Sequence, residues 1–226
     1  MGYGHLTRQL RVAVGVGAMA IVLAATPVAA ATPVASWQLN DRSGAMVDSA
    51  GSHNGTVGSD VMRTGSSYKF PYIAPNSVYR PQHIVTVPNR ADLNPGTANW
   101  ALTARFRFSN SFGNMAQKGQ SGLAYFKMEA PKGVVKCLFR GSAGSISVSS
   151  GTPLNDGAWH VVTCRRAGAD VTMTIDGTRI RRGSGPTGAI SNTFPFSIGG
   201  KSKCNAVKVS CDYWVGEMDY VKIEKG

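Results

Sequence analysis

The sequence has few acidic residues. Aspartate and glutamate together number 12, against 24 lysines and arginines, and the only glutamates are Glu129, Glu217 and Glu224. Glycosidases need two carboxylates about 5–10 Å apart across the scissile bond. The one closely spaced pair, Glu217 and Asp219, falls in a predicted closing strand, where a bulge would turn the two to different faces. With no Gly-x-Ser-x-Gly elbow either, the sequence predicts a non-enzymatic protein; a dispersed Ser/His/Asp set stays open.

Long hydrophobic runs are also lacking, with one exception at the N-terminus. The uncharged run Val12–Ala25 has 14 residues, follows basic residues and precedes Pro27 and an Ala-x-Ala site. A bilayer span needs about 20 apolar residues, whereas this pattern is typical of a cleavable secretion signal. We therefore expect a signal peptide over residues 1–31 and a secreted domain over 32–226, with no membrane span after cleavage. An uncleaved membrane anchor is the alternative.

The charge of the secreted part limits its partners. Loss of Arg8 and Arg11 with the signal leaves 22 basic and 12 acidic residues, a net charge of +10. Such a charge favours anionic partners outside the cell, such as acidic polysaccharides, phosphate-bearing wall polymers or a membrane surface. It is equally typical of a protein kept soluble by surplus charge. Nucleic acid is not expected, because no nucleic-acid-binding motif is present and the compartment is wrong.

Cysteines are scarce but even in number. In an exported chain, four cysteines point to two disulfides, and their spacing does not match a zinc site. We favour a cross-strand bridge between Cys137 and Cys164, whose strands are predicted to be near neighbours, and a loop staple between Cys204 and Cys211.

Helical periodicity is almost absent, and short alternating strands take its place. In Trp100–Phe108 the apolar residues share one face and Thr103, Arg105 and Arg107 the other, which is the pattern of a half-buried antiparallel strand. Asp176-Gly177 separates two further alternating runs and suits a hairpin turn of two positive-φ residues. About a dozen such strands predict one all-β domain of two packed sheets. The other expected strands are Val34–Asn40, Ile84–Val87, Ala124–Met128, Val134–Arg140, Ser145–Ser149, Trp159–Arg165, Phe196–Ile198 and Trp214–Ile223.

The last strand has an irregular step. Met218 and Val221 should both point inward, yet strict alternation would place them on opposite faces. A β-bulge near Asp219-Tyr220 would restore the phase.

Several motifs, in this order, resemble a known family. The most specific are Asp156–Val162, with its Trp-His strand, and Ile175-Asp176-Gly177 after it. Trp37-Gln38-Leu39 and Gln117-Lys118-Gly119 precede them, and Gly216–Ile223 is similar to the family's closing strand. The chain thus resembles a laminin G-like (LamG) module of the concanavalin A-like lectin/glucanase superfamily. The resemblance implies a two-sheet antiparallel jelly-roll sandwich that binds glycans or proteins through its rim loops or concave face.

Two groups of residues are candidates for a ligand surface. The stretch Arg63–Arg80 carries Tyr68 and Tyr72, and aromatic rings of this kind can stack on sugars. They could equally pack over a sheet edge. A second group of arginines could form one basic stripe that binds sulfate, phosphate or carboxylate through paired hydrogen bonds. The alternative is a solvated face that protects the sheet edge. The members of this group are Arg165, Arg166, Arg179, Arg181 and Arg182.

Asp219 is a candidate metal ligand. The resemblance allows a structural calcium ion between the closing strand and the opening loops, with oxygens from Asp219, Asn40 and Asp41. The alternative is a carboxylate that accepts hydrogen bonds from turn amides.

Together these observations predict a secreted, non-catalytic module that binds an extracellular glycan or anionic wall polymer. The alternative is a structural domain at the cell surface that binds a surface protein and has no affinity for sugar.

Overall fold

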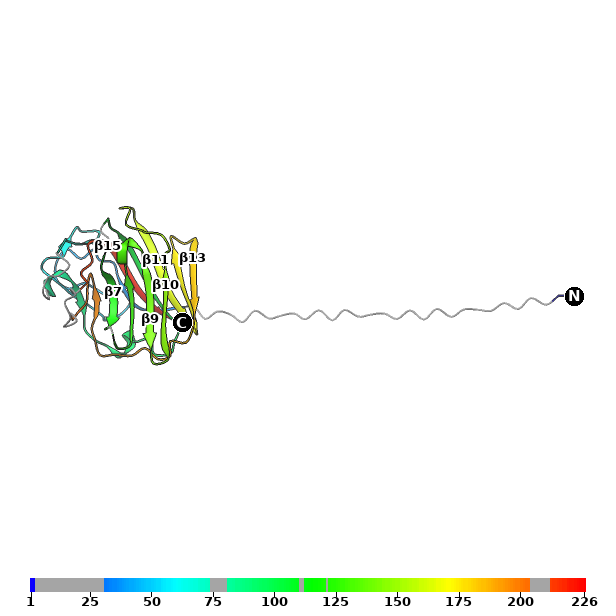
Figure 1. Cartoon of the computed structure of the whole chain (residues 1–226). Helices are drawn as coiled ribbons and strands as arrows, with labels where there is room; N and C mark the ends of the chain where they lie inside the picture. The colour runs from blue at the N-terminus through cyan, green and yellow to red at the C-terminus, as the bar shows by residue number, and fades with distance from the viewer. Residues whose placement is uncertain (3–30, 74–80, 110–111, 121, 204–211) are drawn as a thin grey trace.

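The structure, a computed structural model, is a sandwich of two antiparallel β-sheets (Figure 1). It describes residues 1–2, 31–73, 81–109, 112–120, 122–203 and 212–226, so the predicted signal peptide lies almost wholly outside the described residues. The described residues contain three short 3-10 helices and no α-helix, and none of their helices could cross a membrane. The predicted all-β jelly-roll is confirmed.

The larger sheet has eight strands, in the order β13-β12-β11-β6-β15-β4-β3, and β1 pairs with β15 beside β4. Its strands are β1 (Thr32–Trp37), β3 (Met62–Arg63), β4 (Tyr68–Phe70), β6 (Trp100–Arg107), β11 (His160–Ala167), β12 (Asp170–Ile175), β13 (Arg179–Ser184) and β15 (Gly216–Lys225).

The smaller sheet has seven strands, in the order β10-β9-β8-β7-β14-β5-β2. Its strands are β2 (Thr56–Val57), β5 (Val85–Val87), β7 (Asn114–Gly119), β8 (Tyr125–Glu129), β9 (Lys136–Gly141), β10 (Gly144–Ser149) and β14 (Phe196–Ile198).

The core lies between the sheets and follows the alternation of the strands. In β6 the apolar side chains are buried, while Arg105 and Arg107 on the opposite face are partly or fully exposed. Across the interior, Trp37 of the larger sheet stacks on Phe196 of the smaller one with ring centroids 5.3 Å apart. Burial of such rings is the main favourable contribution to folding.

The predicted hairpin is present between β12 and β13. Asp176 and Gly177 have φ values of 52° and 73°, as the turn requires. Ile175 pairs with Arg179 rather than with Thr178, so the loop is one residue longer than a two-residue turn.

The predicted bulge in the closing strand is also confirmed. The register of β15 against β6 shifts between Met218 and Tyr220. Met218 and Val221 are consequently both buried, and Asp219 is the extra residue.

The disulfide between Cys137 and Cys164 forms as predicted, but its place in the fold differs. Its Cα atoms lie 5.5 Å apart. Cys137 lies in β9 and Cys164 in β11, so the bridge joins the two sheets through the core rather than neighbouring strands of one sheet. Cys204 and Cys211 lie outside the described residues.

Four strands were missing from the sequence-based prediction: β2, β3, β4 and β7. No strand was expected in the stretch Arg63–Arg80, but it contains β4, whose Tyr68 is fully buried with 0% of its surface exposed. The polar segment Asn114–Gly119 was not expected to be a strand, yet it forms β7, and all of its residues are buried.

Candidate functional site

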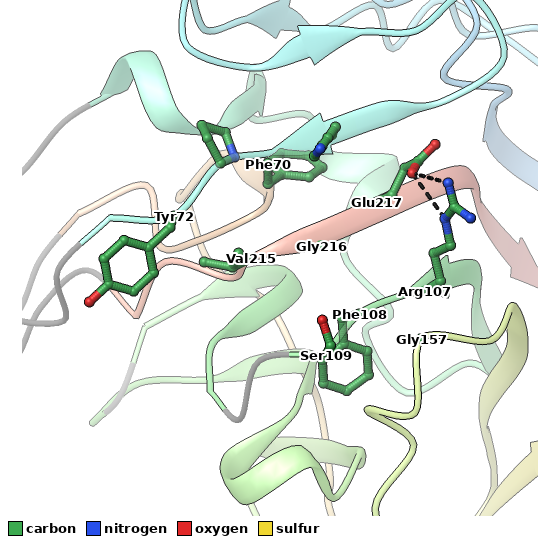
Figure 2. Close-up of a pocket in the computed structure, with 11 residues that line it drawn as sticks. Phe70, Tyr72, Arg107, Phe108, Ser109, Gly157, Val215, Gly216 and Glu217 are labelled. Atoms are coloured by element: carbon green, nitrogen blue, oxygen red, sulfur yellow. Dashed lines mark hydrogen bonds and ion pairs between the residues drawn. The ribbon is translucent and has the colours of Figure 1, made fainter.

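A pocket of about 690 Å³ opens where β4 and β6 end and β15 begins. We call it the rim pocket (Figure 2). Its volume lies within the range of small-molecule sites. It is lined by Lys69, Phe70, Pro71, Tyr72, Arg107, Phe108, Ser109, Gly157, Val215, Gly216 and Glu217.

Tightly packed aromatic rings support the apolar part of the rim pocket. The buried ring of Trp214 lies 5.6 Å from that of Phe70 and 5.9 Å from that of Phe108, between centroids. A Cβ atom on Gly216 would come within 2.5 Å of the Trp214 ring, so glycine is needed there. The lining is therefore held in place by the core.

Tyr72 borders the rim pocket and is 68% exposed. Figure 2 shows its ring on one side of the pocket, with the Arg107–Glu217 pair on the other. Of the two predicted tyrosines, Tyr72 is thus free to meet a ligand. Tyr68 is not, because its ring is part of the core and its hydroxyl donates to Asp41 Oδ2 at 3.1 Å.

An ion pair forms the polar side of the rim pocket. Arg107 donates from Nε and Nη2 to Glu217 Oε2, at 3.0 and 2.7 Å. Ser67 Oγ donates to the other carboxylate oxygen. Burial opposes ionisation of Glu217, but the hydrogen bonds from Ser67 and Arg107 outweigh it, and the pKa of Glu217 falls below its usual value. Lys69 pairs with Glu217 in register, is exposed and makes no ion pair with any described residue.

Trp159 organises the neighbouring surface, a role not predicted from the sequence. The guanidinium groups of Arg105 and Arg107 lie 4.5 and 5.0 Å from its ring centroid. Such cation–π contacts hold both arginines against the sheet. His160, next in the chain, contacts Asp176 through Nδ1 at 2.9 Å and Asp156 through Nε2 at 3.1 Å.

Beyond Trp159, the outer face of the larger sheet is polar and hollowed. We call this surface, which points away from the smaller sheet, the polar face. A hollow of about 570 Å³ lies in its middle. There the hydroxyl groups of Thr103 and Thr163 are 3.0 Å apart and hydrogen-bonded. The hollow is lined by Ser36, Gln38, Thr103, Val161, Thr163, Tyr220, Lys222 and Glu224.

The predicted five-arginine stripe does not exist as one surface. Arg166 points into the protein and is 1% exposed. Its guanidinium donates to the backbone carbonyls of Gly96, Ala98 and Gly188. These bonds replace the water that the buried charge has lost, so Arg166 cannot meet a ligand.

The remaining four arginines divide into two pairs. Arg179 Nη1 donates to Thr152 Oγ1 at 3.0 Å, and Arg181 Nε donates to the carbonyl of Ser150 at 3.3 Å. Both therefore tie β13 to the segment after β10, in the opposite sheet. Of the five predicted arginines, only Arg165 and Arg182 lie on the polar face.

The proposed calcium ligands do not converge. Asp219 forms an ion pair with Arg105, while Asp41 accepts hydrogen bonds from Tyr68 and from the backbone of Val47. Within the described ranges, no group of three or more His, Cys, Asp or Glu side chains is placed to hold a metal ion. The carboxylates of Asp219 and Asp41 thus have other partners and do not fit a shared calcium site.

The fold agrees with comparisons to known proteins. Three solved structures resemble it: domains LG4-5 of the mouse laminin alpha1 chain (16% identical, TM-score 0.53), the binding domain of Paraclostridial Mosquitocidal Protein 1 (13%, 0.60) and the binding domain of Botulinum neurotoxin serotype D (13%, 0.59). They match 70%, 86% and 86% of this chain, which spans 40%, 48% and 47% of theirs.

No curated protein sequence matches the chain. A family model does: the model of the Laminin G domain matches residues 106–225. The chain therefore belongs to the laminin G domain family, whose members are non-catalytic binding modules.

Proposed function

We propose that this protein is secreted and binds an extracellular glycan in the rim pocket. The observation that carries the proposal is the exposed Tyr72 ring beside a rigid pocket of about 690 Å³ whose other side is charged. Membership of the laminin G family supports a binding role, and a buried disulfide suits the oxidising environment outside the cell.

The groups in the rim pocket suit a sugar. An exposed tyrosine offers an aromatic face to the apolar side of a pyranose ring at little cost in side-chain entropy. Lys69 and Ser109 supply hydrogen-bonding groups, and Arg107 keeps N–H groups that Glu217 does not use. A few polar groups in a mostly apolar pocket are what fixes a ligand's orientation.

The same groups do not suit hydrolysis. Among the described residues that line the rim pocket, Glu217 is the one carboxylate, and Arg107 and Ser67 hold it ionised. A glycosidase needs a second carboxylate, one of the two being protonated to serve as the acid. The pocket can therefore hold a sugar without cleaving it.

Binding to an array of neutral and acidic oligosaccharides tests the proposal. In Tyr72→Ala, we expect affinity for the bound sugars to fall roughly tenfold, about the 1.4 kcal/mol of one lost stacking contact. Tyr125→Ala is the matched control, since Tyr125 is partly exposed on the smaller sheet, and should bind as the wild type does. Absence of binding to every glycan, or an equal loss in the control, would overturn the proposal in favour of a protein partner.

A further inference from the structure

Two arginines stand in one row across the polar face. Arg165 of β11 pairs with Thr172 of β12, which in turn pairs with Arg182 of β13. Residues directly opposite each other in a sheet point to the same side. Neighbouring strands are about 4.8 Å apart, so the two arginines are separated by roughly 10 Å, with the Thr172 hydroxyl between them.

The guanidinium groups of Arg165 and Arg182 make no hydrogen bond and no ion pair with any described residue. Arg105 and Arg107 on the same face are each paired with a carboxylate. Two free cations on one face thus leave a local excess of positive charge.

Two acidic side chains lie near this row, and neither forms an ion pair with Arg165 or Arg182. Asp170 lines a hollow of about 330 Å³ together with Thr172 and Arg182 but forms no ion pair with a described residue. Glu224, farther along the row, is paired with Lys222 at 2.7 Å.

Next to this row lies a row of hydroxyl groups. Thr174, Thr163 and Thr103 pair in succession across β12, β11 and β6. Ser36 continues this row beyond Lys222 on β15. This row of hydroxyls runs alongside the two arginines into the 570 Å³ hollow. There the hydroxyl groups of a sugar chain could form hydrogen bonds.

We infer that the polar face is a second binding surface, for an extended acidic glycan that runs across the strands. Acidic groups on the chain bind to Arg165 and Arg182, and its sugar hydroxyls bind in the hollow. Guanidinium groups bind carboxylate, sulfate and phosphate through paired hydrogen bonds. The separation of the arginines selects an oligomer carrying at least two acidic groups rather than a single sugar. The inference rests on the proposed function only in that the ligand is a glycan.

The test measures binding of the exported protein to polygalacturonate, dextran sulfate and a polyol-phosphate wall polymer, with neutral dextran for comparison, over a series of salt concentrations. These polymers separate the three sources of negative charge. The double variant Arg165→Gln/Arg182→Gln should bind the preferred acidic polymer at least tenfold more weakly at low salt and with a shallower salt dependence. Asp170→Asn, which removes the nearest opposing charge, should bind more tightly.

The matched control is Arg179→Gln/Arg181→Gln. It removes the same amount of charge from β13 alone, and its two side chains contact the segment after β10 instead of facing the polar face. It should retain most of the affinity once its fold is verified by circular dichroism. Equal losses in the two double variants would show a response to net charge alone and overturn the inference. Equally tight binding of duplex DNA would overturn the assignment to a glycan.

The two proposals can fail separately. If the polar-face double variant binds as the wild type while Tyr72→Ala loses affinity, the polar-face inference is wrong and the rim pocket stands. If Tyr72→Ala has no effect on any glycan while the double variant loses acidic polymers, the polar face stands and the rim pocket does not.

Discussion

The two sheets differ in how open their outer faces are. The larger sheet carries Arg105, Arg107, Arg165 and Arg182 on its outer face and leaves that face open. In the smaller sheet, Lys118 is buried on the core side, where it pairs in register with Phe126 and Phe196.

The outer face of the smaller sheet is covered near β7 and β14. Gln117 and Ser197 are buried there, and Ser197 Oγ donates to the carbonyl of Gly200 at 2.7 Å. The chain after β14 therefore lies over this sheet. Each sheet buries a cation, Arg166 in the larger and Lys118 in the smaller, and each carries others on its outer face. The difference lies in access: the outer face of the smaller sheet is closed near β7 and β14, whereas the polar face of the larger sheet is open.

The largest effect on stability is expected at a buried ion pair in the chain after β14. Lys201 and Asp212 are 5% and 8% exposed and form an ion pair. Lys201→Met should lower the free energy of unfolding by about 3–5 kcal/mol, because it leaves the buried carboxylate of Asp212 without its cationic partner. Urea denaturation measures this loss.

The matched control for that change lies on the larger sheet. Lys222 is paired with Glu224 at a partly exposed site, so Lys222→Met should cost under about 1 kcal/mol. Similar losses in the two variants would contradict the contrast between the sheets.

A smaller effect is expected from the pH dependence of Lys118. Its ammonium donates to Asn89 Oδ1 and to the carbonyl of Phe194, both at 2.7 Å, and burial lowers its pKa from 10.5 to about 8. Between these values the unfolded chain binds the proton and the folded one does not, so stability should rise as the pH rises from 8 towards 10.5. Chemical denaturation at a series of pH values measures the rise.

Lys118→Met is the control for this titration. It removes the buried amine while keeping an apolar side chain of similar length, so its stability should lack the rise over that range. If the stability of Lys118→Met rose by the same amount, the rise would come from groups other than Lys118.

The smallest effect is expected at His160, beside the rim pocket. Burial disfavours its charge, but Asp176 and Asp156 outweigh burial and raise its pKa above 6.5. This stabilisation is complete below 6.5 and is lost as the pH rises through the raised pKa of the folded state. Because the aspartates are largely exposed, we expect a change under about 1 kcal/mol. In His160→Gln this pH-dependent loss of stability should be absent. A larger change of the wild type in the opposite direction, a gain of stability as the pH rises over the same range, would contradict the assignment.

Much of the fold could be predicted because it depends on local alternation. The faces of Trp100–Phe108 and the bulge at Asp219 both follow from the two-residue period of a strand. The strand β7 could not be predicted, because its polar side chains find their partners far away in the chain: Lys118 bonds to Asn89 and Phe194, and Asn114 to Asp212. Local sequence does not contain those contacts.

The site was only partly predictable. Tyr72 is at the rim pocket, as expected for a ligand-binding aromatic, but the burial of Tyr68 depends on its pairing with β15. The placement of Arg165 and Arg166 on opposite faces could have been predicted from the sequence. Consecutive strand residues point to opposite faces, so an inward Cys164 in the disulfide places Arg165 outside and Arg166 inside.

The bridge between the two sheets also matters when the protein is under tension. Cys137 and Cys164 enclose a loop with a sequence separation of 27. Pulling on the ends of the oxidised chain cannot extend that loop, which would contribute roughly 90 Å of length if it were fully stretched. When the ends of the oxidised chain are pulled, β10 and the start of β11 therefore stay inside a covalent ring, even when the strands around them are separated.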